Sequence, residues 1–277
     1  MSRSHHARAP THKNSKQQLR QTPKGTAKQT TRAGTRVERT RQISLELDCN
    51  SLVIYMEIRA ERFRLSLVLN SVFFPVTSPE AFQSFSSRGF NILIPQGRLP
   101  SGPRVYFTGP FAQKKGVLID SDSNRNMVGT EADSSDNTVE VFLEVINILK
   151  EDFFVDLNTE LNYVELIAHF LVLTDSNPLE ALRDFTGIRD RKAVDEILQA
   201  QTSDYRVSIV PRDVLPSDRK WFEINISPKL TMPTKAYWVE VVYRDETHDR
   251  VTSFAEKSIE TISRLIEIVE ENSRSKS

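Results

Sequence analysis

Cysteine and long apolar runs are scarce in this chain, and each shortage excludes a class of protein. The single cysteine, Cys49, has no second thiol with which to form an internal disulfide or a cysteine-based metal cluster. No apolar run approaches the roughly 18 residues that span a bilayer, and the polar N-terminus lacks the apolar stretch of a secretion signal. We therefore expect a cytoplasmic protein that does not enter a membrane.

Catalytic signatures are also missing. The sequence contains no glycine-rich phosphate loop, no paired-histidine zinc helix and no G-x-S-x-G nucleophile elbow. Outside the first 42 residues only two histidines remain, His169 in an apolar segment and His248 in an acidic turn. The absence of these signatures therefore indicates a protein that is not an enzyme and needs no cofactor.

Negative charge is nearly absent from the first 42 residues. They hold eleven lysines and arginines against one acid, Glu38, so this segment carries +10 and the rest of the chain carries −10. Their only large apolar side chains are Met1, Leu19 and Val37, and burial cannot offset the entropy lost on ordering such a backbone. We predict a disordered basic tail over residues 1–42.

Three interpretations of the tail stay open. It is an arm that binds nucleic acid phosphates without sequence preference, an arm that shields the acidic body, or the product of a start codon assigned too far upstream. The cations that would contact phosphate are Lys13, Lys16, Arg20, Lys24, Lys28, Arg32 and Arg36.

The rest of the chain contains two similar segments that predict short helices. Residues 78–85 and 177–185 each place a capping side chain before a proline, then apolar residues about three apart, and then a glycine at Gly89 or Gly187. Longer apolar stripes at helical spacing follow each segment, over residues 139–149 and 259–269. Each half is therefore expected to close with a long helix.

A second match concerns strands that run into proline. The pattern Ile94-Pro95, Leu99-Pro100-Ser101, Arg104, Tyr106 has the same internal spacing as Val210-Pro211, Leu215-Pro216-Ser217, Lys220, Phe222. Both matches occur in the same order along the chain. They predict an internal duplication, with halves at 43–152 and 153–277.

Alternating and apolar runs supply the expected strands of both halves. They are residues 52–58, 63–69, 90–94, 104–108, 116–120, 127–132, 154–157, 163–173, 205–210, 221–226 and 236–243. The predicted fold class is α+β: a pseudo-twofold duplicated antiparallel sheet with helices packed on one face.

This order of elements resembles the duplicated saddle of the TATA-binding protein family, over about residues 50–272. The resemblance implies one curved antiparallel sheet with helices on its convex side. The sequence departs from that family because the paired phenylalanines that wedge DNA cannot be placed. It also adds a helical segment at 192–199, has one strand fewer after Trp221, and carries −10 on the body, which would repel phosphate. The same order also resembles uncharacterised duplicated prokaryotic families.

One segment matches the spacing of a calcium loop. Asp120, Asp122, Asn124 and Glu131 stand at positions one, three, five and twelve of an EF-hand pattern, but position six is Arg125 instead of glycine. The flanks are typical of strands, so a polar hairpin turn explains the same residues. A metal-dependent enzyme built on these carboxylates is the third-ranked hypothesis.

Aromatic residues gather on two expected strands of the second half. If alternate members lie on an open sheet face, they form a platform for a protein segment or a small ligand. The candidates are Trp221, Phe222, Tyr237, Trp238 and Arg244. The sequence thus predicts a non-enzymatic binding module that uses a curved sheet face or a cleft between the two halves, with nucleic acid binding through the tail as the alternative.

Overall fold

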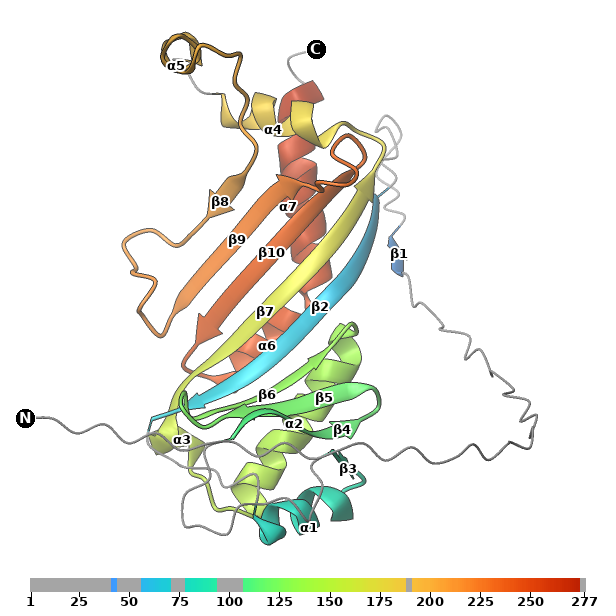
Figure 1. The fold of residues 1–277 in the computed structure, drawn as a ribbon, viewed down its shortest axis with the longest axis vertical. Coiled ribbons are helices and arrows are strands. Elements are labelled where there is room, and N and C mark those ends of the chain that lie inside the picture. The colour runs from blue at the N-terminus through green and yellow to red at the C-terminus, as the bar shows by residue number, and fades with distance from the viewer. Residues whose placement is uncertain (1–40, 44–55, 71–77, 94–106, 188–190, 275–277) are drawn as a thin grey trace, which may run out of the picture. The chain divides into compact units, whose positions relative to one another are not determined.

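The computed structural model describes residues 41–43, 56–70, 78–93, 107–187 and 191–274 (Figure 1). The predicted tail therefore lies outside the described residues, apart from its last two. So does the proline segment at 94–106.

The described residues form helices and strands in a mixed α+β fold. The strands are β1 (Arg41–Ile43), β2 (Met56–Leu69), β3 (Asn91–Ile92), β4 (Thr108–Lys114), β5 (Val117–Asp122), β6 (Met127–Ala132), β7 (Leu161–Thr174), β8 (Val207–Ile209), β9 (Trp221–Pro228) and β10 (Ala236–Asp245). The helices are α1 (Pro79–Ser87), α2 (Ser135–Glu151), α3 (Leu157–Glu160), α4 (Pro178–Thr186), α5 (Arg191–Leu198), α6 (His248–Glu256) and α7 (Ser258–Arg274).

All strands belong to one antiparallel sheet. Its order is β3-β4-β5-β6-β2-β7-β10-β9-β8, and β1 pairs with the first residues of β2 beside this path. The two 14-residue strands β2 and β7 pair along their length at the centre of the sheet and bend visibly (Figure 1). The remaining strands of each half extend the sheet outward from this pair.

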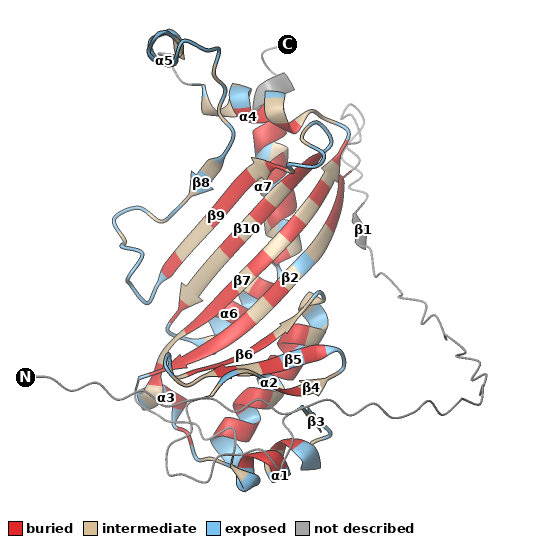
Figure 2. Cartoon of the chain, viewed as in Figure 1, coloured by how far each residue is buried: buried red, intermediate tan, exposed pale blue. Residues whose placement is uncertain are grey.

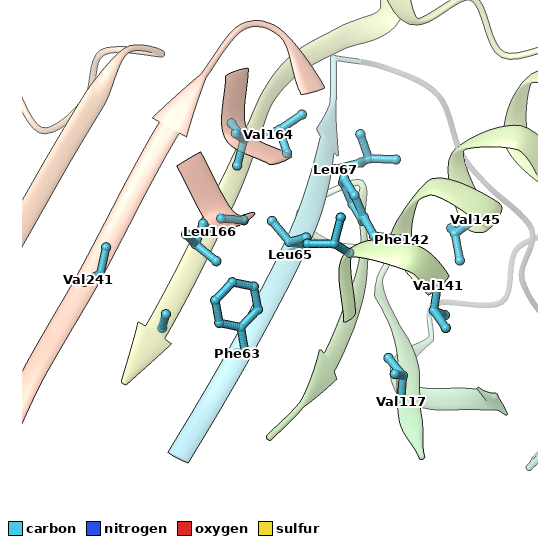
Figure 3. Close-up of a cluster of buried hydrophobic side chains, with 14 of the residues drawn as sticks. Phe63, Leu65, Leu67, Val117, Val141, Phe142, Val145, Val164, Leu166 and Val241 are labelled. Carbon is cyan, nitrogen blue, oxygen red and sulfur yellow. The ribbon is translucent and has the colours of Figure 1, made fainter. Parts of the chain in front are cut away.

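The core lies between one face of the sheet and the helices. Phe63, Leu65 and Leu67 alternate along β2 and are fully buried, because the pleat turns every second side chain to the same side. Figure 3 shows them beside Phe142 of α2. Helix α2 packs on β2, β5 and β6, while α6 packs on β7 and β10, and both helices cover the same face. The burial of alternate residues appears as bands across the central strands in Figure 2.

The helix signals in the sequence are confirmed. Ser78 accepts a hydrogen bond from the Ala81 amide at the start of α1, and Asn177 accepts one from the Leu179 amide at the start of α4. Gly187 ends α4 in the left-handed conformation, with φ of 52°. Within the described residues no helix is both long and apolar enough to cross a membrane.

Several strand predictions need correction. The separate strands expected before and after residues 59–62 are one strand, β2, with an irregularity between Ala60 and Arg62. The strand expected at 154–157 is wrong, because the Val155 amide bonds to the Leu149 carbonyl at the end of α2 and Asp156 caps α3. Helix α6 was not expected as a separate element.

The strand order is nearly symmetric about the central pair, but it does not test the sequence match that involves residues 94–106. Counted outward from the centre, β6, β5 and β4 correspond to β10, β9 and β8. Phe222 lies in β9, third from the centre, whereas its sequence match Tyr106 lies outside the described residues. The antiparallel sheet with helices on one face is thus confirmed, while the internal duplication stays a prediction.

Candidate functional site: the helix-free face of the sheet

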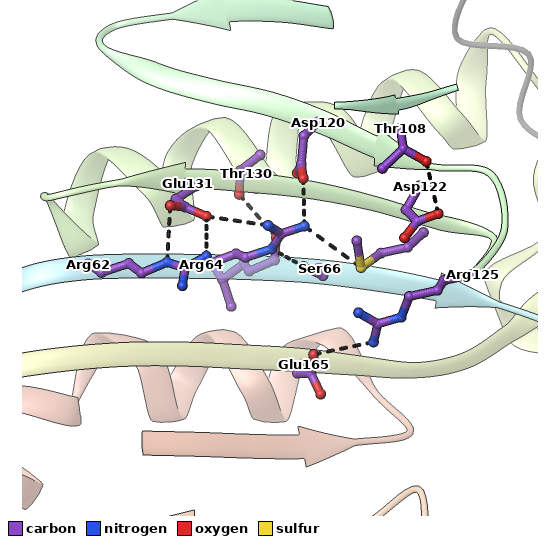
Figure 4. A network of polar contacts seen from close by, with 12 residues as sticks. Arg62, Arg64, Ser66, Thr108, Asp120, Asp122, Arg125, Thr130, Glu131 and Glu165 are labelled. Atoms are coloured by element: carbon purple, nitrogen blue, oxygen red, sulfur yellow. Dashed lines mark hydrogen bonds and ion pairs between the residues drawn. The ribbon is translucent and has the colours of Figure 1, made fainter. Parts of the chain in front are cut away.

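The face of the sheet opposite the helices, here the helix-free face, carries a cluster of ion pairs at its centre. Strand alternation places Arg62, Arg64 and Ser66 of β2 together on it. Arg62 donates two hydrogen bonds to Glu131 of β6, at 3.0 and 2.9 Å, and Arg64 donates to Asp120 of β5 at 2.6 Å and to Glu131 at 3.3 Å (Figure 4). Three strands are thereby joined by charged side chains as well as by their backbones.

Gly129 makes room for this cluster. It pairs with Ser66 on one side and with Asp120 on the other, so its missing side chain would point into the network. A Cβ atom there would lie 2.7 Å from Asp120 Oδ1, 2.9 Å from Ser66 Oγ and 3.2 Å from Arg64 Nη2. Glycine allows this close approach, since a side chain here would displace the groups around Arg64.

The two carboxylates of the cluster, Asp120 and Glu131, have pKa values shifted in opposite directions. Burial raises the pKa of Asp120 above its ordinary value, although Arg64 acts in the other direction, and Asp120 Oδ1 is buried without a hydrogen-bond partner. Burial also acts to raise the pKa of Glu131, but the hydrogen bonds and charges of Arg62 and Arg64 outweigh it and hold the value low. Glu131 is therefore the better neutralised of the two.

A second ion pair links β7 and β10. The side chain of Glu165 is only 4% exposed, and Arg244 Nε donates to it at 2.5 Å. Arg244 also donates to the Pro216 carbonyl at 3.0 Å and lies over the Tyr163 ring, 5.2 Å from its centroid. This arginine therefore holds a buried carboxylate and the loop before β9 at the same time.

An aromatic group lies further along the same two strands. The ring of Trp238 on β10 is 5.4 Å from that of His169 on β7, and Lys229 Nζ lies 3.4 Å above the indole. Burial lowers the pKa of His169 below its ordinary value, against the pull of Glu240. One face of this indole is thus already covered by a cation.

Between these polar groups runs a row of half-buried apolar side chains on the helix-free face. Val164, Leu166 and the other helix-side residues of β7 are buried, whereas the apolar residues that alternate with them are only partly covered. The row consists of Tyr163, Ile167, Leu171 and Leu173 of β7 with Val242 of β10. No described helix packs on this side of β7 and β10.

The structure divides the five predicted platform residues between the two faces. Trp221, Trp238 and Arg244 belong to the helix-free face, but Trp221 is 8% exposed and offers little free surface. Tyr237 is fully buried on the helix side, and Phe222 packs against the core there. Strand alternation explains the division, because neighbouring residues point to opposite faces.

The calcium-like segment forms the polar hairpin that joins β5 to β6. Asp122 accepts hydrogen bonds from the Asn124 amide at 3.0 Å and from the Thr108 hydroxyl at 3.3 Å, while Asp120 and Glu131 are engaged by arginines. In the described part of the chain no group of three or more histidine, cysteine or acidic side chains is placed to hold a metal ion. The predicted phosphate-contacting residues of the tail lie outside the described residues.

Arg62, Arg64 and Glu165 of the site were not predicted from the sequence. A usable signal was present, because Arg62-Phe63-Arg64-Leu65-Ser66-Leu67 alternates cations or hydroxyls with large apolar residues. That pattern predicts a strand with one polar, charged face. The partners of these arginines come from segments about 56 to 69 residues away and could not be paired from the pattern.

Comparison of the chain with protein-family models finds no match, and comparison with curated protein sequences finds no similar protein.

Proposed function

We propose that this protein is a non-enzymatic binding module that holds a segment of a partner protein across the helix-free face. The observation that carries the proposal is the row of half-buried apolar side chains on β7 and β10, on a side that no described helix covers. In sheets with helices on both faces, such strands are covered on both sides. Here the described helices cover one side of β7 and β10, so the row on the other side is available to another apolar surface.

The dimensions of the row favour a protein segment over a small ligand. It spans Tyr163 to Leu173, with Glu165 and His169 between its apolar members, and ten residue steps along a strand extend about 33 Å. The flanking charges are largely matched within the chain, as in Arg62 with Glu131 and Arg244 with Glu165. Because these charges are already paired, the surface suits a partner that makes apolar contacts at its centre and polar contacts at its rim better than it suits a phosphate backbone.

A pair of substitutions on opposite sides of the sheet tests the proposal. Leu171→Lys places a charge within the row, and Ile268→Lys places one on the exposed side of α7, where Ile268 is 49% exposed. Partners captured from the cells that produce the protein should be lost with Leu171→Lys and retained with Ile268→Lys. Equal retention of partner proteins by both folded variants would contradict the proposal. Capture of a small molecule without any protein would show that the ligand is not a protein segment.

The charge of the N-terminal segment supports a second candidate function. Residues 1–42 carry +10, and evenly spaced cations of this kind bind nucleic acid through counterion release. Removal of residues 1–38 should abolish salt-sensitive retention on DNA and RNA, while Leu171→Lys should leave that retention unchanged. Retention that survives the truncation would exclude the tail as the binding element.

We also propose a cytoplasmic location, on the grounds of the single cysteine and the absence of long apolar runs in the sequence.

A further inference from the structure

The ion pairs beside the apolar row of the helix-free face present their cations to the solvent. On β2, the side chain of Arg59 is 38% exposed, and that of its partner Glu57 is 11% exposed. At the turn between β5 and β6, Arg125 is 51% exposed, and Glu165, which it approaches at 3.9 Å, is 4% exposed (Figure 4). The same order of exposure holds for two further pairs, Arg62 with Glu131 and Arg206 with Glu240. A molecule that approaches the row thus meets more guanidinium than carboxylate surface.

Arg64 is the exception to this order. It is less exposed than Asp120 and Glu131, because it lies between these two carboxylates. Both carboxylates come from β5 and β6, on the side of β2 away from the row. The cations nearest the row therefore keep the outward position.

One further cation of this face, Lys229, has no carboxylate partner among the described residues. It lies in the turn between β9 and β10, and its Nζ atom is 3.4 Å above the indole of Trp238. In the strand register, Trp238 of β10 and Arg59 of β2 are the two neighbours of Leu171. The row thus has a cation on each side at Leu171.

The next position of β7 on this face, His169, is flanked in the same way. Its register neighbours are Arg62 of β2 and Glu240 of β10, and Arg206 reaches Glu240 from the segment before β8. Four cations and three carboxylates therefore surround Leu171 and His169, namely Arg59, Arg62, Arg206 and Lys229 with Glu57, Glu131 and Glu240. This area has a net charge of 4 − 3 = +1, whereas the chain after residue 42 carries −10.

The width of the row matches a helix. Strands β2 and β10 are the two neighbours of β7, so they lie about 10 Å apart on either side of the row. An α-helix with its side chains is about 10–12 Å wide, and about 22 residues of helix span the 33 Å of the row. Helices α2 and α6 already cover the other face of the sheet.

We propose that the partner segment of the helix-free face is an acidic amphipathic helix. Its apolar side packs on the row, and aspartates or glutamates on its two flanks face Arg59 and Arg62 on one side and Lys229 and Arg206 on the other. This partner class rests on the function proposed above. The N-terminal segment of the chain does not fit the site, because its own charge is +10.

Binding of three synthetic helices to the full chain, measured by fluorescence anisotropy, tests the partner class. The first carries leucines at helical spacing on one side and glutamates on both flanks. Lysines replace the glutamates in the second, and serines replace the leucines in the third. The first should bind at least tenfold more tightly than either of the others. Equal binding of the first and second helices, or of the first and third, would overturn the proposal.

Variants of the protein locate the binding. Lys229→Glu reverses a cation that has no ion pair to lose, and should weaken binding of the first helix at least fivefold. Arg264→Glu on α7 is the matched control, because the pair of Arg264 with Glu260 is exposed, and should leave binding unchanged. The basic N-terminal segment is the same in both variants, so its attraction for glutamate cannot make them differ. Equal losses in the two variants would overturn the proposal.

Leu171→Ser distinguishes failure of the acidic partner from failure of the binding face. It should weaken binding of the first helix, because it removes an apolar contact of the row. Tighter binding of the lysine helix, itself weakened by Leu171→Ser, would keep the row as the binding surface and overturn its acidic partner alone. Binding of the first helix that is unchanged by Leu171→Ser would contradict both.

Discussion

The two faces of the sheet achieve burial by different means. On the helix side, apolar residues such as Phe63 and Phe142 fill the space against α2 without charged partners. On the helix-free face, Arg64 pairs with Asp120 and Glu131, and the buried Glu165 pairs with Arg244. One face is thus stabilised by packing, and the other depends on the geometry of its ion pairs.

The largest expected effect lies on the packed face. Phe63→Ala removes a fully buried ring that meets Phe170 edge to face at 6.5 Å, and should lower the free energy of unfolding by about 3–5 kcal/mol. Urea denaturation measures this loss. A loss below about 1 kcal/mol would mean that the helix side is not the main core.

Removal of Arg244 tests whether the helix-free face depends on paired charges. Arg244→Met leaves the buried Glu165 carboxylate without its closest cation and should cost about 2–3 kcal/mol. Arg206→Met is the control, because its pair with Glu240 is exposed and should contribute about 0–1 kcal/mol. Equal losses in the two variants would show that burial of Glu165 does not matter.

A smaller effect is expected from filling the space beside Arg64. Gly129→Ala sets a methyl group against Asp120 and Ser66 and should cost about 1–2 kcal/mol. Part of that loss should disappear when Asp120→Ala is added, because the nearest atom is then gone. Thermal unfolding of the single and double variants checks this, and strictly additive losses would contradict the proposed crowding.

The smallest effect concerns pH. Burial keeps the pKa of His169 below its ordinary value of 6.5, so the unfolded chain takes up a proton before the folded chain does. The stability that His169 contributes is therefore complete above pH 6.5 and is lost as pH falls through the lowered folded pKa. His169→Gln should flatten this decline in unfolding measurements between pH 7.5 and 5.

His248 provides the comparison for this pH experiment. Burial also lowers the pKa of His248, at the start of α6, so His248→Gln should remove a separate part of the decline. A pH profile unchanged by His169→Gln would show that the ring is not desolvated beside Trp238.

Local signals in the sequence predict most of the helices and strands. The pairings between residues far apart in the sequence could not be predicted. The caps Ser78 and Asn177 and the apolar stripes of α2 and α7 could be read directly, because each depends on residues a few positions apart. The contacts of Arg64 with Asp120 and of Arg244 with Glu165 could not, because the register between strands places them together.

The candidate site shows the same limit. The aromatic pairs Trp221-Phe222 and Tyr237-Trp238 could be recognised as strand residues. Which member of each pair faces the helices depends on the side of the sheet that the helices cover, and the sequence does not show that side. Trp238 and Tyr237 follow one another in sequence, yet one contacts His169 and Lys229 while the other is fully buried.

The central claim is that the helix-free face is the binding surface, and site-specific photo-crosslinking tests it most directly. A photoreactive residue at Leu171, within the apolar row, should form a crosslink to a partner protein in the cells that produce the chain. The same residue at Ile268, on the exposed side of α7, should not. Crosslinks at Ile268 with none at Leu171 would contradict the account.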